Sequence, residues 1–222
     1  MLLAVDCSTQ WMGLALFQGE QILAEQVWQT RSHHSVELTP AIDQLFHKTG
    51  ITARDLNVLA VASGPGSFTS LRIGMAVVKG LSLALHIPVI GIPTLDILAA
   101  GVQVRNMMLA AVLQAGRGRL AVGWYEAAEE KWQATGELEV LTPDELEQKV
   151  KKPTLICGEL SVEERQVLAR KWKNVTLASP AECVRRPAYL AQLAWSRWQN
   201  MDVDDVVSLA PSYLHYKEAI PG

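Results

Sequence analysis

Residues 63–74 read SGPGSFTSLRIG and place two glycines around a proline, directly after an apolar run. That run, Val58–Ser63, has the length and branched apolar content of a buried strand, and Leu71–Leu85 has the length of a helix. Glycine reaches backbone angles closed to other residues and proline stiffens a corner, so the stretch predicts a strand turning sharply into a helix. Such a corner either cradles a phosphate or lets strand and helix pack tightly. We favour tight packing and expect Ser67 or Thr69 to cap the helix.

Strand-like and helix-like segments alternate along the chain, which is typical of a mixed α/β fold. The first three predicted strands are 2–5, 13–17 and 22–28, and the last two form a hairpin around Gly19 and Glu20. The other predicted strands are 58–63, 88–92, 107–115, 120–126, 131–138 and 154–158, and the predicted helices are 35–48, 71–85, 94–102, 142–150, 162–172 and 188–198.

The order of the elements fits two lobes that share a cleft, although one mixed sheet has the same spacing. We expect residues 1–102 to form an N-terminal lobe and residues 103–222 a C-terminal lobe, whose tail can pack back on the first lobe. The late tryptophans Trp172, Trp195 and Trp198 belong either to the core of the second lobe or to an additional contact surface, and we favour the core.

Composition narrows the class of protein. The 222 residues are 49% hydrophobic and carry a net charge of −3, so the chain can bury a core and shows no basic excess typical of a stand-alone nucleic-acid binder. Cys7, Cys157 and Cys183 are far apart and form no CxxC pair, which argues against a disulfide framework or a zinc knuckle. The longest apolar region, 81–104, is interrupted by polar residues and prolines, so we expect a cytoplasmic protein without a membrane span.

Three stretches together resemble a known family. LLAVDCSTQWMGLAL, RSHHSVELTPAIDQL and LAVASGPGSFTSLRIGMAVVKGLSLALHIPVIGIPTLDILA are similar to the tRNA threonylcarbamoyladenosine biosynthesis family, and best match its bacterial non-catalytic branch. The resemblance implies an actin-like, Hsp70-like and sugar-kinase-like fold. It also implies a scaffold subunit that helps to attach threonylcarbamoyl to the adenosine next to the anticodon of tRNAs reading codons that begin with A.

The same resemblance separates a scaffold from the enzyme. Catalytic relatives carry two histidines four residues apart after the strand that follows the glycine corner, and a pair with that spacing on one helix face can share a cation. The matching positions here are Thr94 and Leu98, so we expect no catalytic residue and no metal. The five histidines, His33, His34, His47, His86 and His215, are expected in surface or capping roles.

A nucleotide site is a weaker possibility, and an ATP-binding or ATP-hydrolysing enzyme of the same fold is the alternative function. Asp6, Ser8 and Thr9 resemble the first phosphate loop of the actin-like fold, and Gly64 is a further weak candidate for binding a cofactor. The other interpretation is that these side chains only satisfy the hydrogen bonds of a tight turn. Because Glu159 would repel phosphate from the expected second loop, we expect no cofactor.

The resemblance also implies partners: a catalytic TsaD-type subunit, a TsaE-type ATPase in the assembled complex, and tRNA only through that complex. The helices at 35–48 and 71–85 are expected to build a four-helix contact with the catalytic subunit. In the absence of that subunit, the same surface is expected to form a homodimer. The candidate interface residues are Leu38, Ile42, Gly74, Val77, Val78 and Leu81. The other interpretation is that the helix at 71–85 packs against the lobe's own sheet, because the sequence does not distinguish residues that face a partner from residues of the core.

Overall fold

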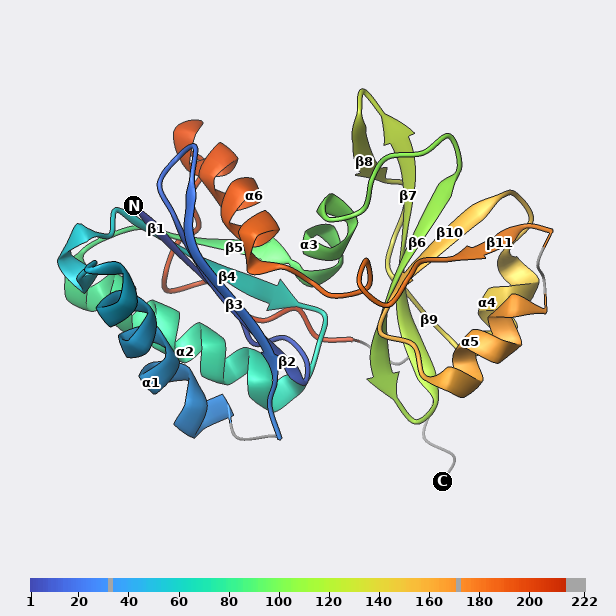
Figure 1. The fold of residues 1–222 in the computed structure, drawn as a ribbon, viewed down its shortest axis with the longest axis horizontal. Helices are drawn as coiled ribbons and strands as arrows, with labels where there is room; N and C mark the ends of the chain where they lie inside the picture. Colours follow the sequence, from blue (N-terminus) through green and yellow to red (C-terminus); the bar gives the residue numbers. More distant parts are fainter. Residues whose placement is uncertain (32–33, 171–172, 215–222) are drawn as a thin grey trace.

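A computed structural model describes residues 1–31, 34–170 and 173–214. His33, Trp172 and His215 therefore lie outside the described residues. The chain forms two sheets, each with helices packed against it, that lie side by side along the long axis of the molecule (Figure 1). The predicted mixed α/β class is confirmed.

The first lobe is built on a five-stranded sheet in the order β3-β2-β1-β4-β5. The predicted hairpin is present as antiparallel β2 and β3, while β1, β4 and β5 run parallel. Its strands are β1 (Leu2–Asp6), β2 (Trp11–Phe17), β3 (Ile22–Gln29), β4 (Val58–Gly64) and β5 (Val89–Pro93). Its helices are α1 (His34–Thr49), the short 3-10 turn η1 (Ala53–Asp55), α2 (Phe68–Leu85) and α3 (Thr94–Ala100).

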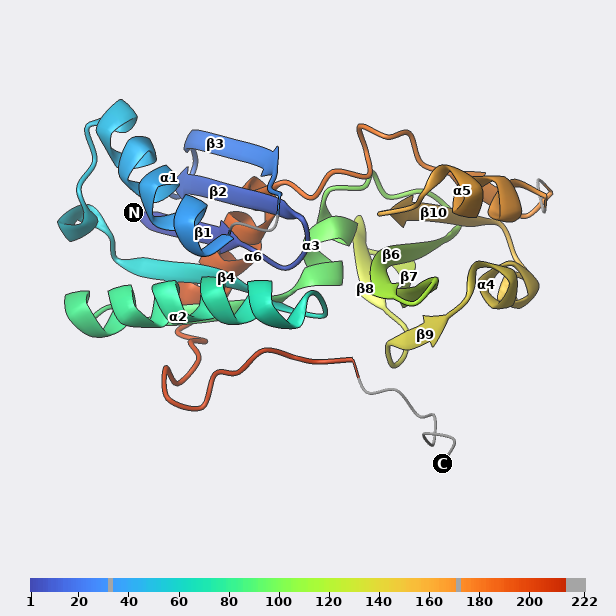
Figure 2. The ribbon, with the colours of Figure 1, turned by 90° about the horizontal axis from the view of Figure 1, so that it is seen from below.

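Helices cover both faces of this sheet, which explains why its strands read as continuous apolar runs. On β1, Leu3 and Val5 pack on the side of α1 and α2, whereas Leu2 and Ala4 pack on the side of α6 (Pro187–Gln199). Figure 2 shows α2 and α6 on opposite sides of the strands. The two cores of the first lobe are thus separated only by the sheet itself.

Helix α2 has enough length and apolar content to cross a membrane, and no other helix in the described ranges does. In the fold it is a packed helix of the first lobe, because Leu71, Met75 and Val78 are buried against the sheet. Its N-cap position is Ser67, as predicted, but the Ser67 side chain makes no capping hydrogen bond. Instead its hydroxyl accepts from the Ser70 hydroxyl at 3.0 Å.

The second lobe contains a six-stranded sheet in the order β11-β10-β6-β7-β8, with β9 paired to β7. Its strands are β6 (Met108–Gly116), β7 (Arg119–Ala128), β8 (Lys131–Ala134), β9 (Glu139–Leu141), β10 (Thr154–Gly158) and β11 (Val175–Leu177). Helices α4 (Pro143–Lys149) and α5 (Val162–Ala169) pack on one face, and α3 packs on the other (Figure 1). The predicted strand at 131–138 is wrong in extent: it ends at Ala134, and β9 then pairs with β7.

Helix α6 and the described segment that follows it return to the first lobe. Helix α6 packs its buried Leu190, Ala191 and Ala194 against the first sheet. Trp195 stacks edge-on against Phe17 of β2 with ring centroids 5.4 Å apart, so its predicted place in the second-lobe core is wrong. Trp198 belongs to the same first-lobe core.

Beyond α6 the chain runs along β5 and the glycine corner. Asp204 forms an isolated antiparallel bridge with Val89. The backbone N–H of Ser212 donates to the carbonyl of Ser63 at 2.7 Å, and Tyr213 accepts from the Arg72 guanidinium of α2 at 2.8 Å. The tail therefore links the end of β4 to the start of α2.

Candidate functional site

The turn after β1 brings together three of the predicted site residues. The Asp6 carboxylate accepts from the Ser8 backbone N–H at 2.9 Å and from the Ser8 hydroxyl at 2.5 Å. The Thr9 hydroxyl accepts from the Trp11 backbone N–H at 3.2 Å. All three predicted residues are buried, and their polar groups satisfy the turn itself.

Arg185 enters this turn from the segment that connects β11 to α6. Its Nε donates to Asp6 Oδ2 at 2.9 Å, and one terminal nitrogen donates to the Thr9 hydroxyl at 2.8 Å. The Arg185 side chain is 1% exposed and that of Asp6 is 3% exposed, so this is an ion pair removed from water. Burial disfavours the charged guanidinium, but the carboxylates of Asp6 and Glu159 outweigh it and raise the pKa of Arg185.

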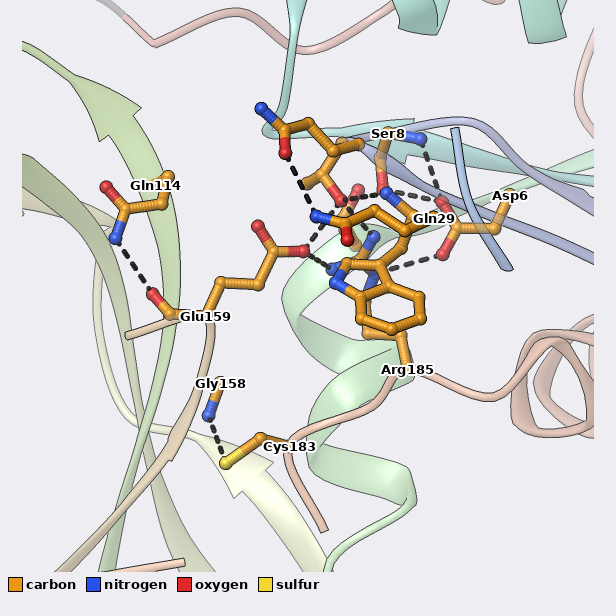
Figure 3. A network of polar contacts seen from close by, with 12 residues as sticks. Asp6, Ser8, Gln29, Gln114, Gly158, Glu159, Cys183 and Arg185 are labelled. Atoms are coloured by element: carbon orange, nitrogen blue, oxygen red, sulfur yellow. Dashed lines mark hydrogen bonds and ion pairs between the residues drawn. The ribbon is translucent and has the colours of Figure 1, made fainter. Parts of the chain in front are cut away.

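Glu159 completes the cluster from the second lobe. It follows β10, and its Oε1 accepts from Arg185 at 2.6 Å and from the Thr9 hydroxyl at 2.6 Å. Figure 3 shows Arg185 between Asp6 on one side and Glu159 on the other. We call Asp6, Ser8, Thr9, Glu159 and Arg185 the Arg185 cluster. It joins the two lobes through one cation and two carboxylates.

The glycine corner packs against this turn. A Cβ added at Gly66 would lie 2.1 Å from the Ser8 carbonyl oxygen, so only glycine fits there. Gly64 has φ +107, and a Cβ there would lie 2.4 Å from the Ser212 carbonyl oxygen. Its N–H donates to the Thr94 hydroxyl at 3.1 Å, so Gly64 contacts Thr94 and the tail instead of the Arg185 cluster. The corner serves close backbone packing.

The chemistry open to the cluster is limited by its charges. Beside it lies a cavity of about 1250 Å³ between the lobes, lined in part by Thr9, Gly66, Gly158 and Glu159. The Arg185 guanidinium is shared between two carboxylates, so an entering phosphate would have to displace a buried carboxylate to reach it. Within residues 1–31, 34–170 and 173–214, no group of three or more metal-ligating side chains is present.

The positions that match the histidine pair of catalytic relatives lie on α3. Thr94 is buried and accepts the Gly64 N–H, and Leu98 is 2% exposed. Leu98 approaches Gly158, where a Cβ would lie 3.0 Å from its Cδ2. These two side chains fill the space between the glycine corner and β10 with a hydrogen bond and an apolar contact.

The described histidines have different environments. His34 is 4% exposed, so its predicted surface or capping role is wrong: Nε2 donates to the Thr9 carbonyl at 2.8 Å, and Nδ1 lies 3.4 Å from the Ser70 hydroxyl. His47 is exposed in the last turn of α1. His86 is exposed and ends α2 in the left-handed conformation, as a capping residue does. His34 thus anchors the start of α1 beside the cluster.

Four of the six predicted interface residues belong to the chain's own core. Leu38, Ile42 and Val78 are buried between α1, α2 and the sheet. Gly74 is buried against β1, where a Cβ would lie 3.0 Å from the Cys7 Cβ. None of these four residues presents its surface outward in the single chain, and their contact with a partner stays a prediction.

Val77 and Leu81 are partly exposed and remain candidates. Their exposed neighbours Ala76, Gly80 and Leu83 are not among the predicted interface residues. The 3.6-residue period places them on the outer side of α2 once Leu71, Met75 and Val78 are known to face inward.

Arg185 was also missed. The signal was indirect: an acidic residue at the end of the buried apolar run LLAV needs a cation, and the Arg-Arg pair before the last helix supplies one. Nothing local in the sequence chooses between Arg185 and Arg186.

Comparisons with known proteins agree with this architecture. A family model described as TsaD, tRNA N6-adenosine threonylcarbamoyltransferase, matches residues 21–205. The tRNA threonylcarbamoyladenosine biosynthesis protein TsaB of Bacillus subtilis is 28% identical over 98% of this chain and 95% of its own length. The TsaB protein of Escherichia coli is 33% identical over 47% of this chain and 45% of its own length.

The solved structure of YeaZ from Pseudomonas aeruginosa superimposes with a TM-score of 0.75 at 24% identity, covering 96% of this chain and 99% of that one. The predicted actin-like fold with two lobes is confirmed. The predicted resemblance is confirmed as well, since the family model spans most of the chain. The chain belongs to the TsaD family of tRNA threonylcarbamoyladenosine biosynthesis proteins.

Proposed function

We propose that this chain is a non-catalytic subunit of the complex that adds threonylcarbamoyl to the adenosine next to the anticodon of tRNAs reading codons that begin with A. In this proposal it binds and stabilises a catalytic TsaD-type subunit in the cytoplasm, a TsaE-type ATPase joins them, and tRNA is reached only through the complex. The names of the relatives connect those proteins with the same modification.

The observation that carries the proposal is the outer side of α2. Ala76, Gly80, Leu83 and Ala84 are exposed there, beside the partly exposed Val77. A Cβ added at Gly80 would meet nothing within 4 Å, so the backbone is open to a neighbouring helix. Small residues flanked by larger apolar ones let two helices pack closely. Leu83 is 60% exposed, and a partner helix would cover this apolar side chain, which lowers solubility when it is left in water. We call Ala76, Val77, Gly80, Leu83 and Ala84 the α2 stripe.

The Arg185 cluster supports the non-catalytic part of the proposal. The residues that resemble a phosphate loop bind one another and Arg185, which argues against the alternative of an ATP-binding enzyme. Thr94 and Leu98 supply no imidazole to hold a metal beside a reacting group. The chain offers an apolar surface for assembly, and the Arg185 guanidinium beside its cleft is already bound by the chain's own carboxylates.

Reconstitution tests the function directly. The catalytic subunit, the ATPase, threonylcarbamoyl-AMP and a substrate tRNA are mixed with and without this chain, and the modified nucleoside is measured. We expect modification only when the chain is present and none from the chain alone. Modification by the chain unaided, or full activity without it, would contradict the proposal.

The homodimer is tested by light scattering. We expect the isolated chain to dimerise through the α2 stripe and the dimer to dissolve when the catalytic subunit is added. If the homodimer and the partner complex exist in one particle, the two contacts use different surfaces and the shared-surface proposal is wrong.

A further inference from the structure

Two cysteines far apart in sequence meet beside the interlobe cavity. Cys157 lies on β10, and Cys183 lies on the segment that leads to Arg185. Their sulfur atoms are 4.0 Å apart. Cys157 is buried, whereas Cys183 is partly exposed and lines the cavity of about 1250 Å³. A small solute in the cavity can thus reach Cys183, whereas Cys157 is buried next to Cys183 and is not reached from the cavity directly.

The surroundings of Cys183 favour a thiolate. An Arg165 nitrogen from α5 donates to the Cys183 sulfur at 3.2 Å, and the Gly158 backbone N–H donates at 3.4 Å, as Figure 3 shows for Gly158. The hydrogen bond from the Cys157 thiol, together with these donors, lowers the pKa of Cys183 despite its burial. The charged group in contact with Cys183 is the Arg165 guanidinium, and the Glu182 carboxylate acts on Cys157, whose pKa it helps to raise.

The pair has the arrangement of an attacking and a resolving thiol. A reactive cysteine is an exposed thiolate in an electropositive setting, and a second thiol within reach completes the reaction as a disulfide. The third cysteine differs in each respect: Cys7 is buried in the first-lobe core, and burial together with the neighbouring Asp6 carboxylate raises its pKa. Cys7 is therefore a control within the same chain.

We propose that Cys183 is an oxidation site for small hydroperoxides and that Cys157 resolves the oxidised form as an intramolecular disulfide. The Cys183 thiolate sulfur attacks one peroxide oxygen, the O–O bond breaks, and the departing oxygen takes a proton to leave as water or an alcohol. The Cys157 sulfur, losing its proton, then attacks the sulfenic sulfur, the S–S bond forms, and hydroxide leaves as water with that proton. Two thiols lose two electrons in total, and the hydroperoxide accepts them.

The position of the pair connects this chemistry to the Arg185 cluster. Cys157 is two residues before Glu159, and Cys183 is two residues before Arg185. A disulfide would therefore tie together the two backbone segments that carry the interlobe ion pair of 2.6 Å. Closing the sulfur separation from 4.0 Å to about 2.05 Å requires these segments to approach or their side chains to rotate.

The experiment uses the full chain, reduced and then treated with hydrogen peroxide, with peptide mass mapping. We expect the loss of two hydrogens within a linked Cys157–Cys183 peptide pair and an unchanged Cys7. Cys157→Ala should stop the reaction at a sulfenic acid on Cys183, which dimedone labels, and Cys183→Ala should abolish both products. Circular dichroism of each variant establishes that it is folded.

Arg165→Gln supplies a readout that a purely structural role would not move. Without the guanidinium, the dimedone-trapped rate in the Cys157→Ala background should fall about fivefold at about pH 6. It should recover at about pH 9, where the Cys183 thiol ionises with or without Arg165. A linked pair that includes Cys7, or a Cys183 that reacts no faster than in the urea-unfolded chain, would overturn the proposal.

Discussion

The interlobe cleft and the outer side of α2 differ in the groups that they contain: paired charges in the cleft, and exposed apolar surface on α2. In the cleft, each charge of the Arg185 cluster has a partner, and in the described part of the chain no buried side-chain nitrogen or oxygen lacks a hydrogen bond. On α2, apolar side chains and a bare glycine backbone face solvent. The polar groups of the cleft connect the two lobes, whereas α2 exposes apolar surface to solvent. An exposed apolar surface is expected of a subunit that binds another protein.

The largest expected effect comes from removing the central cation of the cleft. Arg185→Met leaves Asp6 buried without its counter-charge and removes the interlobe ion pair of Glu159, because both carboxylates share that one guanidinium. The Glu159 carboxylate then keeps the hydrogen bond from the Thr9 hydroxyl. We expect the free energy of unfolding to fall by about 3–5 kcal/mol, the usual cost of breaking a buried ion pair. Urea denaturation followed by tryptophan fluorescence measures it.

The adjacent arginine is the matched control. Arg186 pairs with Glu25 of β3, but its side chain is 56% exposed, and such a pair contributes about 0–1 kcal/mol. If Arg186→Met destabilises the chain as much as Arg185→Met does, burial of the ion pair is not what determines its contribution to stability here.

The second prediction concerns the α2 stripe. Ala76→Arg places a charged side chain where a partner helix would pack, and we expect affinity for the catalytic subunit to fall about tenfold to hundredfold. Folding stability should change by less than about 0.5 kcal/mol, because Ala76 is exposed in the isolated chain. Isothermal titration calorimetry measures the affinity.

Val162→Arg is the control for that measurement, since Val162 is also an exposed apolar residue on a helix, but it lies at the start of α5 on the second lobe. It should leave the affinity unchanged. Equal losses for the two variants would mean that the contact with the catalytic subunit is not on α2.

Local rules explain what the sequence could predict. The β4 to α2 corner follows from glycine and proline geometry, and the helix start at Thr142 follows from a capping box whose Glu145 N–H donates to the Thr142 hydroxyl at 3.2 Å. Both depend on residues within a few positions of each other, so a single sequence contains the needed information.

The Arg185 cluster and the true outward residues of α2 depend on distant contacts. Arg185 and Asp6 are separated by 179 positions, and no short-range pattern connects them. Helix α2 is apolar over most of its circumference, so Val77 and Val78 have the same pattern in the sequence. In the structure Val78 is fully buried, whereas Val77 lies at the edge of the same core and is partly exposed. Which stripe faces inward is decided by the sheet beneath it, and that is why the interface prediction selected core residues.

Two glycines on α2 sharpen the comparison at a smaller scale. Gly80→Ala adds a methyl group into open space and improves helix propensity, so it should raise the free energy of unfolding by about 0.5–1 kcal/mol while weakening partner binding. Gly74→Ala places a methyl group 3.0 Å from the Cys7 Cβ, so it should lower the free energy of unfolding by about 1 kcal/mol. Thermal unfolding of both variants measures the two signs. The same sign for both would mean that α2 has no distinct inner and outer sides.

The smallest expected effect is the pH dependence of stability at Asp96, where α3 contacts β7 of the second lobe. Burial raises the pKa of Asp96 on α3, although the Tyr125 hydroxyl of β7 donates to it at 2.7 Å. A carboxyl whose folded-state pKa is raised adds stability below its unfolded pKa of about 4 and loses that contribution as pH rises through the folded value. Asp96→Asn keeps an acceptor for Tyr125 without the charge, so its stability should exceed that of the parent at neutral pH by up to about 1 kcal/mol. In urea titrations the gain should vanish at about pH 3, because the parent carboxyl is neutral there. A gain that is constant with pH would show that burial of the Asp96 charge is not its source.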